Sequence, residues 1–373
     1  MSQRDRLIDF LRGVVILDMM LVHFRDYLGF LPNMMVQRLI GYSDIAIEGF
    51  VALSGFMIGR HYYEKFVRDR KVVIRRLLRR TADVVGIYYL MVVTISLPTA
   101  LIMGRAATGG DDIGEFMGKS LLFLNQVGLI HILPTFIPLF LLAIPALFLL
   151  ERNGDFLVLI ASVGFFVFGS LDPYVFTIGE KTIFPVILWQ IYFFFGMVLG
   201  KRSLLKRDKS VGILPHLALA SALFLIGAAA YHGHHLSPGW ELTRDEYGLV
   251  VRKFPLNYLG VIYHGGLLYL LICLIAFLWG PIQRMGRAAE AIELFGRHSL
   301  LAFVIHVYFA KTIGLLVFLT GKPTPLSQVL IIGNVLVTFV ILKHIESLKR
   351  GSVSSSVSST SLERGVLGDH LGS

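Results

Sequence analysis

The feature that most constrains this chain is the recurrence of long apolar runs, separated by short polar interruptions. A helix that crosses a bilayer needs about 20 mostly apolar residues, and these runs are too long and too continuously apolar for β-barrel strands. Hydrophobic residues make up 55% of the chain and charged residues 16%, which excludes an ordinary soluble globular protein. The sequence predicts an all-α integral membrane protein, a polytopic bundle of about ten transmembrane helices, at residues 7–30, 43–63, 81–103, 128–150, 155–171, 183–200, 211–231, 257–279, 299–320 and 327–345.

The distribution of Lys and Arg predicts the orientation of this bundle. With ten spans, the basic loops after the second and sixth spans lie on the same side as both termini, and the positive-inside rule makes that side cytoplasmic. The opposite loops, 104–127, 172–182 and 232–256, contain acidic residues and fewer bases. The net charge of +10 is then explained by topology and by attraction to anionic membrane lipids, so no nucleic-acid partner is expected.

The chain divides by composition into two parts. Residues 1–349 contain every apolar run and form the predicted transmembrane domain, whereas residues 350–373 are rich in Ser and poor in hydrophobic side chains. The second part is predicted to be a disordered cytoplasmic tail. The first apolar run is too long for a cleavable signal peptide, and the single cysteine, Cys273, excludes an intrachain disulfide.

The first span contains several ionisable residues, which are costly inside a bilayer and therefore indicate function. At about 100° per residue, Asp5, Asp9, Arg12 and His23 fall on one face of the helix, and Asp18 points elsewhere and needs another partner. Acids at a helix start, with Asp9 paired to Arg12, would also explain the first three residues. His23 is favoured as a general base, because imidazole titrates near neutral pH.

The second span begins with two acids, Asp44 and Glu48, four residues apart. We expect Glu48 at a depth similar to that of His23, where a carboxylate could orient the imidazole as the acid of a catalytic triad does. Gly55 and Gly59 share the face of these acids and are interpreted as packing positions for a neighbouring helix.

The ninth span presents Ser299 and His306 on one face, seven residues apart. His306 either faces a cleft that also contains Arg12 or is a buried structural hydrogen-bonding residue, and the sequence leaves both interpretations open.

A histidine-rich outer loop raises the question of a metal site. Its spacing matches no standard zinc pattern, so a solvated loop is preferred and no bound metal is expected; the residues concerned are His232, His234, His235 and Glu241.

Motifs between residues 4 and 306 resemble one known family. Together they resemble OpgC, the membrane succinyltransferase of osmoregulated periplasmic glucans, within the acyltransferase-three superfamily of membrane O-acyltransferases. The motifs are the Arg12-x10-His23 spacing, the run S-D-x-A-x-E-x-F-V-x-L-S-G from Ser43 to Gly55, the I-L-P element after His131, the Trp189-Gln190 pair and the run G-R-x-S-L-x-x-F-x-x-H from Gly296 to His306.

This resemblance implies a protein of the bacterial inner membrane that moves a succinyl or acetyl group from cytoplasmic acyl-CoA to a hydroxyl of a periplasmic or cell-surface glycan. Its Arg-x10-His motif corresponds to Arg12 and His23, and its late histidine to His306. Acyl-CoA, the glycan and membrane lipids are the expected partners, and a homo-oligomer is compatible with the pattern. The acyl group can pass directly to the acceptor or through an acyl-histidine.

On this basis we hypothesise that His23 activates the acceptor hydroxyl and that Glu48 or Asp44 orients it. Arg12 would hold the thioester or a pyrophosphate. The expected catalytic residues are thus His23, Glu48 and Asp44, and the expected substrate-binding residues are Arg12, Asp9, Ser54, Arg297, Ser299 and His306.

Two alternatives remain at this point. A related acetyltransferase acting on lipopolysaccharide or exopolysaccharide would share every motif above. A secondary transporter for a small anionic solute would also place charged residues near the midplane, but it typically shows internal inverted repeats, and none is evident in this sequence.

Overall fold

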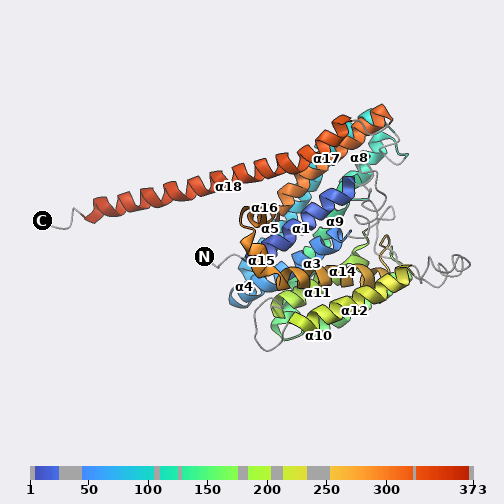
Figure 1. Cartoon of the computed structure of the whole chain (residues 1–373), viewed down its shortest axis with the longest axis horizontal. Helices are drawn as coiled ribbons and strands as arrows, with labels where there is room; N and C mark the ends of the chain where they lie inside the picture. The colour runs from blue at the N-terminus through green and yellow to red at the C-terminus, as the bar shows by residue number, and fades with distance from the viewer. Residues whose placement is uncertain are drawn as a thin grey trace, which may run out of the picture.

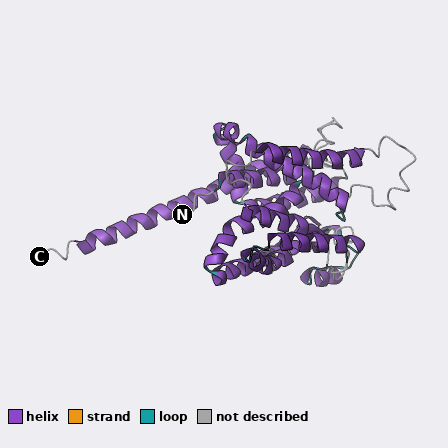
Figure 2. Cartoon of the chain, turned by 90° about the horizontal axis from the view of Figure 1, so that it is seen from below, coloured by secondary structure: helices purple, strands orange, loops and turns teal. Residues whose placement is uncertain are grey.

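The computed structural model describes residues 5–24, 44–104, 110–124, 128–174, 184–202, 213–232, 253–321 and 325–368, with no account of the side chains of 230–232, 327–328 and 350–368. These residues are helical almost throughout, as Figure 2 shows by colour. The helical segments are α1 (Arg6–Phe24), α3 (Ala46–Met57), η2 (Ile58–Tyr62), α4 (Tyr63–Arg68), α5 (Arg70–Met91), η3 (Val92–Ser96), α6 (Leu97–Met103), α8 (Ile113–Leu121), η4 (Gly128–Ile130), α9 (Ile132–Glu151), α10 (Asp155–Leu171), α11 (Val186–Arg202), α12 (Ile213–His232), α14 (Tyr258–Phe277), α15 (Trp279–Arg284), α16 (Arg287–Arg297), α17 (Ser299–Thr320) and α18 (Pro325–Gly368).

Part of this helical set is long and apolar enough to cross a membrane. Among the described residues there are 5 such helices. The all-α class is therefore confirmed, whereas the predicted number of about ten spans is not. The five are Arg70–Met103, Ile132–Glu151, Tyr258–Phe277, Ser299–Thr320 and Val329–Lys349.

The outer surface of the bundle is apolar, as expected of a chain that faces lipid. On α10, Phe156 is 72% exposed and Leu171 is 82% exposed. Similar exposed Leu, Val and Ile side chains lie along α12 and α18. A surface of this kind would associate nonspecifically in water, so it supports a membrane environment for the helices.

The basic loop predicted after the second span, residues 60–80, is helical in the structure apart from Asp69. α4 ends and α5 begins at Asp69, whose side chain accepts a hydrogen bond from the Val72 backbone N–H at 3.1 Å. This N-cap satisfies one of the backbone donors that the first turn of a helix leaves free. The charged stretch is therefore two helices that meet at Asp69, and only this one residue leaves the helical conformation.

The helix α1 lies in the middle of the bundle, against α3, α14, α16 and α17 (Figure 1). Two glycine positions bring α1 and α16 together. A Cβ added at Gly13 would overlap the carbonyl oxygen of Ile292, and one added at Gly296 would overlap the carbonyl oxygen of Asp9. The two backbones are therefore in direct contact, at a distance that only glycine permits.

The glycine pair predicted for packing has this role on α11, where Gly55 of α3 and Gly59 of η2 both contact that helix. A Cβ at Gly55 would overlap the carbonyl oxygen of Phe193, and one at Gly59 would overlap that of Met197. The preferred interpretation of Gly55 and Gly59 as contact positions for a neighbouring helix is confirmed.

One end of the bundle is held together by ion pairs between basic and acidic side chains. Asp155 at the start of α10 lies 2.5 Å from the Lys201 Nζ, and Arg60 lies 2.8 Å from Asp5. Arg6 and Glu293 form another pair at 2.9 Å. We call this the basic end; it contains the residues that the sequence places on one side of the membrane.

The helix α18 runs past the predicted domain boundary. Its backbone is helical as far as Gly368, through the Ser-rich segment for which the sequence predicted disorder. Figure 1 shows this extension projecting away from the other helices.

Candidate functional site

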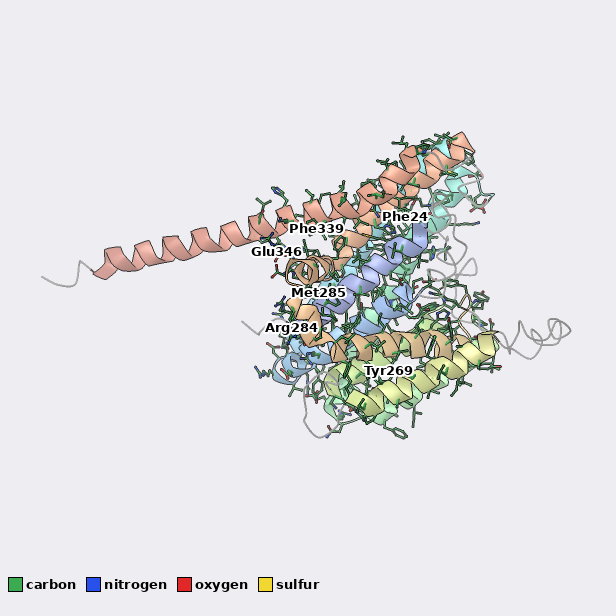
Figure 3. All side chains as sticks on the ribbon, in the orientation of Figure 1. Phe24, Tyr269, Arg284, Met285, Phe339 and Glu346 are labelled. Carbon is green, nitrogen blue, oxygen red and sulfur yellow. The ribbon has the colours of Figure 1, made fainter. Side chains whose placement is uncertain are left out.

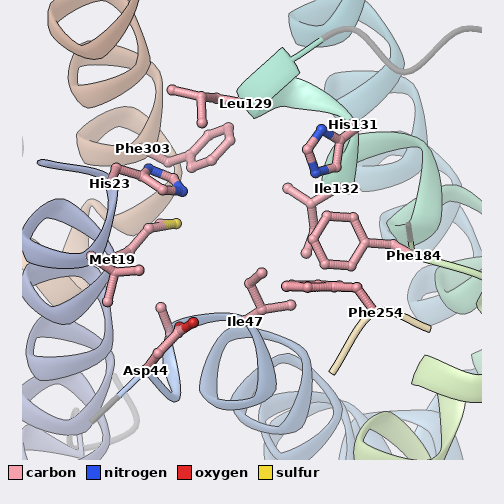
Figure 4. A pocket seen from close by; sticks show the side chains of 12 residues that line it. Met19, His23, Asp44, Ile47, Leu129, His131, Ile132, Phe184, Phe254 and Phe303 are labelled. Carbon is pink, nitrogen blue, oxygen red and sulfur yellow. The ribbon is translucent and has the colours of Figure 1, made fainter. Parts of the chain in front are cut away.

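Several chain segments meet around a pocket of about 190 Å³ at the end of the bundle opposite the basic end. Figure 4 shows His23 and Phe303 on one side of this pocket, and His131, Phe184 and Phe254 on the other. The lining side chains come from α1, α3, η4, α9, α17 and the residues that precede α3, α9, α11 and α14: Met19, Val22, His23, Asp44, Ala46, Ile47, Leu129, His131, Ile132, Phe184, Phe254 and Phe303.

Two histidines from distant parts of the chain form a direct contact at this pocket. The Nδ1 of His23 lies 2.7 Å from the Nε2 of His306, and the two rings are stacked with an interplanar angle of 11°. His306 is fully buried, and the Phe24 ring meets it edge-on at 5.1 Å. One imidazole must donate and the other accept, so the protonation of each ring depends on that of its partner.

Arg12 makes a second contact between the same two helices, α1 and α17. Its guanidinium donates a hydrogen bond to the Oγ of the buried Ser299. Arg12 lies eleven residues before His23 on α1, which is about 16 Å along the helix axis. Two residues of the face predicted for α1, Arg12 and His23, thus contact α17, with the arginine nearer the basic end and the histidine at the pocket, whereas Asp5 pairs with Arg60.

The sequence that forms this site matches the model of a known family. The family model described as OpgC protein matches residues 4–350. The chain belongs to the OpgC family. No curated protein and no solved structure matches it. Membership of the OpgC family indicates a transferase, and it agrees with the resemblance carried by Arg12, His23 and His306.

In this OpgC-family chain the pocket wall opposite His23 is aromatic. The ring of Phe184 stacks on His131 at 4.7 Å and meets Phe254 edge-on at 5.3 Å. Phe254 is 43% exposed, although Trp189 behind it is fully buried. Exposure of a large aromatic side chain at a pocket is consistent with a ligand-binding surface.

The acids of the second span form a separate buried cluster around Lys253. The Lys253 Nζ lies 2.8 Å from Asp44 Oδ1 and 3.1 Å from Glu48 Oε2, and His264 Nδ1 lies 3.9 Å from Glu48 Oε1. Burial alone would lower the pKa of Lys253, but the two carboxylates outweigh it and raise the pKa above its ordinary value.

The expected contact between Glu48 and His23 is therefore corrected. In the part of the chain that the structure describes, Glu48 contacts Lys253 and His264, and His23 contacts His306. Similar depth in the bilayer does not bring two side chains together when their helices turn different faces to each other. Asp44, by contrast, lines the same pocket as His23.

The other predicted site residues are distributed over the bundle. Asp9 is buried on α1, and Ser54 is partly buried on α3. Asp18 has the separate partner that was expected, because it accepts a hydrogen bond from the Ile45 backbone N–H at 3.1 Å. The histidine-rich loop considered for a metal, with His234, His235 and Glu241, lies outside the described residues.

Arg297 lies in a different cavity, of about 400 Å³, between α16 and α18. It forms an ion pair with Glu346 at 3.3 Å, and His298 lies 3.2 Å from the same carboxylate. Figure 3 shows Glu346 and Phe339 on the part of α18 next to α16. Arg12 thus contacts Ser299 and His23 contacts His306, whereas Arg297 lies in the cavity between α16 and α18.

Sequence reasoning missed two residues near the histidines, Lys253 and Asn334. Lys253 precedes α14 and is separated from Asp44 by 209 positions, so no local spacing could have related them. Asn334 is fully buried in an apolar stretch of α18, where a polar amide is itself a signal.

Proposed function

We propose that this protein is an O-acyltransferase of the bacterial inner membrane. It moves a succinyl or acetyl group from cytoplasmic acyl-CoA to a hydroxyl of a periplasmic or cell-surface glycan. Both termini then face the cytoplasm, and the basic end of the bundle is the cytoplasmic end.

The observation that carries this proposal is the arrangement of Arg12 and His23 on α1. His23 lines the pocket and contacts the buried His306 at 2.7 Å, whereas Arg12 lies about 16 Å nearer the basic end. A transfer across a membrane needs an anion-binding group on the donor side and a base on the acceptor side. The two residues supply these groups on one helix.

At the pocket, His23 acts as the general base on the acceptor. It takes the hydroxyl proton as the oxygen attacks the thioester carbonyl carbon, and it returns the proton to the departing thiolate. His306 takes over the orienting role first considered for Glu48, because it is His306 that contacts the His23 ring. Glu48 contributes through its pair with Lys253 to the fold of the pocket rim.

At the donor end, Arg12 meets the phosphates of CoA and not the thioester. When the thioester carbonyl is at His23, a group about 16 Å away along the same helix is too distant to contact it. A guanidinium binds phosphate oxygens through two parallel N–H donors, and the basic end attracts the polyanionic part of CoA. Ser299 holds the Arg12 side chain in place through its hydroxyl.

The acceptor sugar ring lies against the aromatic wall of the pocket. The C–H groups of a pyranose carry partial positive charge, which the negative face of an aromatic ring attracts. Phe254, exposed and next to the Lys253–Asp44 pair, offers such a face with polar groups beside it for the sugar hydroxyls.

The test is transfer of labelled acyl groups by membranes that contain the protein. Labelled succinyl-CoA or acetyl-CoA is added with a glucan acceptor, and label on the glucan is measured by mass spectrometry. We expect transfer by the wild type and none by His23→Ala. His216→Ala, which removes another hydrogen-bonded histidine of the bundle, serves as the matched control and retains activity. Uptake of label into vesicles without transfer, or full transfer by His23→Ala, contradicts the proposal.

A further inference from the structure

A buried amide on α18 extends the histidine contact into a chain of three side chains. The Nδ2 of Asn334 lies 3.0 Å from the Nδ1 of His306, whose Nε2 lies 2.7 Å from the Nδ1 of His23. Asn334 and His306 are both fully buried. Three helices, α1, α17 and α18, thus place Asn334, His306 and His23 in one line that ends at the pocket.

The proton positions along this chain are linked. If Nε2 of His23 is to accept a proton from the acceptor, its Nδ1 must already carry one and donate it to Nε2 of His306. His306 then carries its own proton on Nδ1, and that N–H needs an acceptor. In the part of the chain that the structure describes, the group facing this Nδ1 is the Asn334 amide.

We propose that Asn334 is a positioning residue that, through His306, determines which nitrogen of His23 carries the proton. This inference rests on the proposed function of His23 as the base. When the Asn334 carbonyl oxygen faces His306, the three groups donate in order from His23 to His306 to Asn334, and Nε2 of His23 is free to act.

In the opposite orientation of the amide, His23 cannot act as the base. When Nδ2 of Asn334 donates to Nδ1 of His306, the proton of His306 moves to Nε2, His23 accepts on Nδ1, and its Nε2 carries a proton. The structure places Nδ2 next to Nδ1 of His306 and leaves Oδ1 buried without a partner among the described residues. A half-turn of the amide exchanges the two atoms and lets Oδ1 accept the Nδ1–H of His306. Because a buried carbonyl oxygen is stabilised by a hydrogen-bond donor, this second orientation, with the His23 proton on Nδ1, is the favoured one.

At the end of the reaction, Asn334, His306 and His23 carry the same protons as at its start. The acceptor O–H proton passes to Nε2 of His23, the oxygen forms a C–O bond with the thioester carbonyl carbon, and the C–S bond breaks. The thiolate then takes the proton from Nε2, so the products are the ester and free CoA thiol. Nδ1 of His23 keeps its proton throughout, which is the state that Asn334 stabilises.

Three variants test the proposal. Asn334→Leu removes the acceptor at similar size, Asn334→Asp keeps an acceptor but cannot donate when ionised, and Thr338→Val removes a polar group that is equally buried one turn further along α18. We expect kcat to fall about 100-fold or more in Asn334→Leu, with KM for both substrates unchanged. Asn334→Asp should retain kcat within about tenfold of the wild type, and Thr338→Val should match the wild type.

A spectroscopic measurement separates tautomer from fold. In protein with ¹⁵N-labelled histidine, the His23 signals, identified by their loss in His23→Gln, should report Nδ1–H in the wild type and a changed tautomer in Asn334→Leu. The inference is overturned if Asn334→Leu keeps wild-type kcat, if Asn334→Asp falls as far as Asn334→Leu, or if the tautomer of His23 is the same in all variants. If His23→Ala remains active, the proposed function itself has failed; if only Asn334→Leu remains active, the failure is limited to this inference.

Discussion

The helices α1 and α17 touch through polar side chains at two places, and the two contacts differ in kind. Near the basic end Arg12 donates to Ser299, and at the pocket His23 meets His306 at 2.7 Å. Ser299 and His306, the two partners on α17, are both buried. The first contact involves a cation that does not lose its proton in proteins, whereas the second joins two imidazole rings whose nitrogens can each donate or accept a proton.

The difference shows how one pair of helices can support two tasks. A permanent cation binds an anion at any physiological pH but cannot act as a base, and an imidazole pair transfers protons but holds phosphate weakly. About three helical turns separate the two tasks on α1. If this division is correct, variants at the two contacts should affect different kinetic constants.

The largest effect is expected at the pocket. His23→Gln keeps a hydrogen-bonding side chain but removes the base, so kcat should fall by about 10²- to 10⁴-fold with little change in KM for acyl-CoA. Steady-state kinetics on the purified protein in lipid nanodiscs measures both constants. A variant that raised KM and kept kcat would remove the distinction between the two contacts.

The ion cluster beside the pocket should affect stability and not chemistry. Lys253→Met leaves the buried Glu48 and the partly buried Asp44 without their cation, and breaking a buried pair in this way typically costs about 3–5 kcal/mol of folding free energy. Denaturant unfolding should show this loss, and the double variant Lys253→Met/Glu48→Gln should recover part of it. Glu48→Gln alone should keep the wild-type kcat. If its kcat fell as far as that of His23→Gln, Glu48 would be a catalytic residue after all.

At the other contact, Arg12→Ala should raise KM for acyl-CoA. A hydrogen bond to a charged group is worth about 1.5–3 kcal/mol, which corresponds to about 10- to 100-fold in affinity. Arg12→Lys should lose less, because it keeps the charge without the two parallel donors. Arg297→Ala, in the other cavity, is the matched control and should change KM by less than about threefold. Equal effects at Arg12 and Arg297 would contradict the assignment of the donor to Arg12.

The smallest effect is expected at the aromatic wall. Phe254→Ala should raise KM for the glucan by about 2- to 10-fold, the value of one aromatic contact, and leave KM for acyl-CoA unchanged. Phe156→Ala, at an exposed position on α10, should change neither constant. If the donor KM rises with Phe254→Ala, the wall contacts the acyl chain and not the sugar.

Helical periodicity predicted one side of this site well. The face of α1 that carries Arg12 and His23 follows from a turn of about 100° per residue, and the same rule placed Ser299 and His306 on one face of α17. It also predicted that Asp18 would need a different partner, which is the Ile45 backbone. Positions along a single helix are determined locally, so the sequence is sufficient for them.

The relation between helices could not be predicted in this way. Periodicity does not determine which helix lies opposite a polar face, and depth alone suggested Glu48 as the partner of His23 when the partner is His306. Lys253 and Asn334 reach the site from segments far along the chain, through packing that no local pattern encodes. The helical structure of residues 60–80 was missed because charge was taken to interrupt a helix when it only ended an apolar run.

The glycine contacts between α1 and α16 have a consequence for the chemistry at the far end of α1. Because Gly13 and Gly296 bring the two backbones together, α1 cannot slide or rotate there without collision. A shift of one residue in register would turn His23 by about 100° and move it about 1.5 Å along the axis, away from His306. The orientation of the reactive ring is thus determined about three to four turns away, where two positions lack a Cβ.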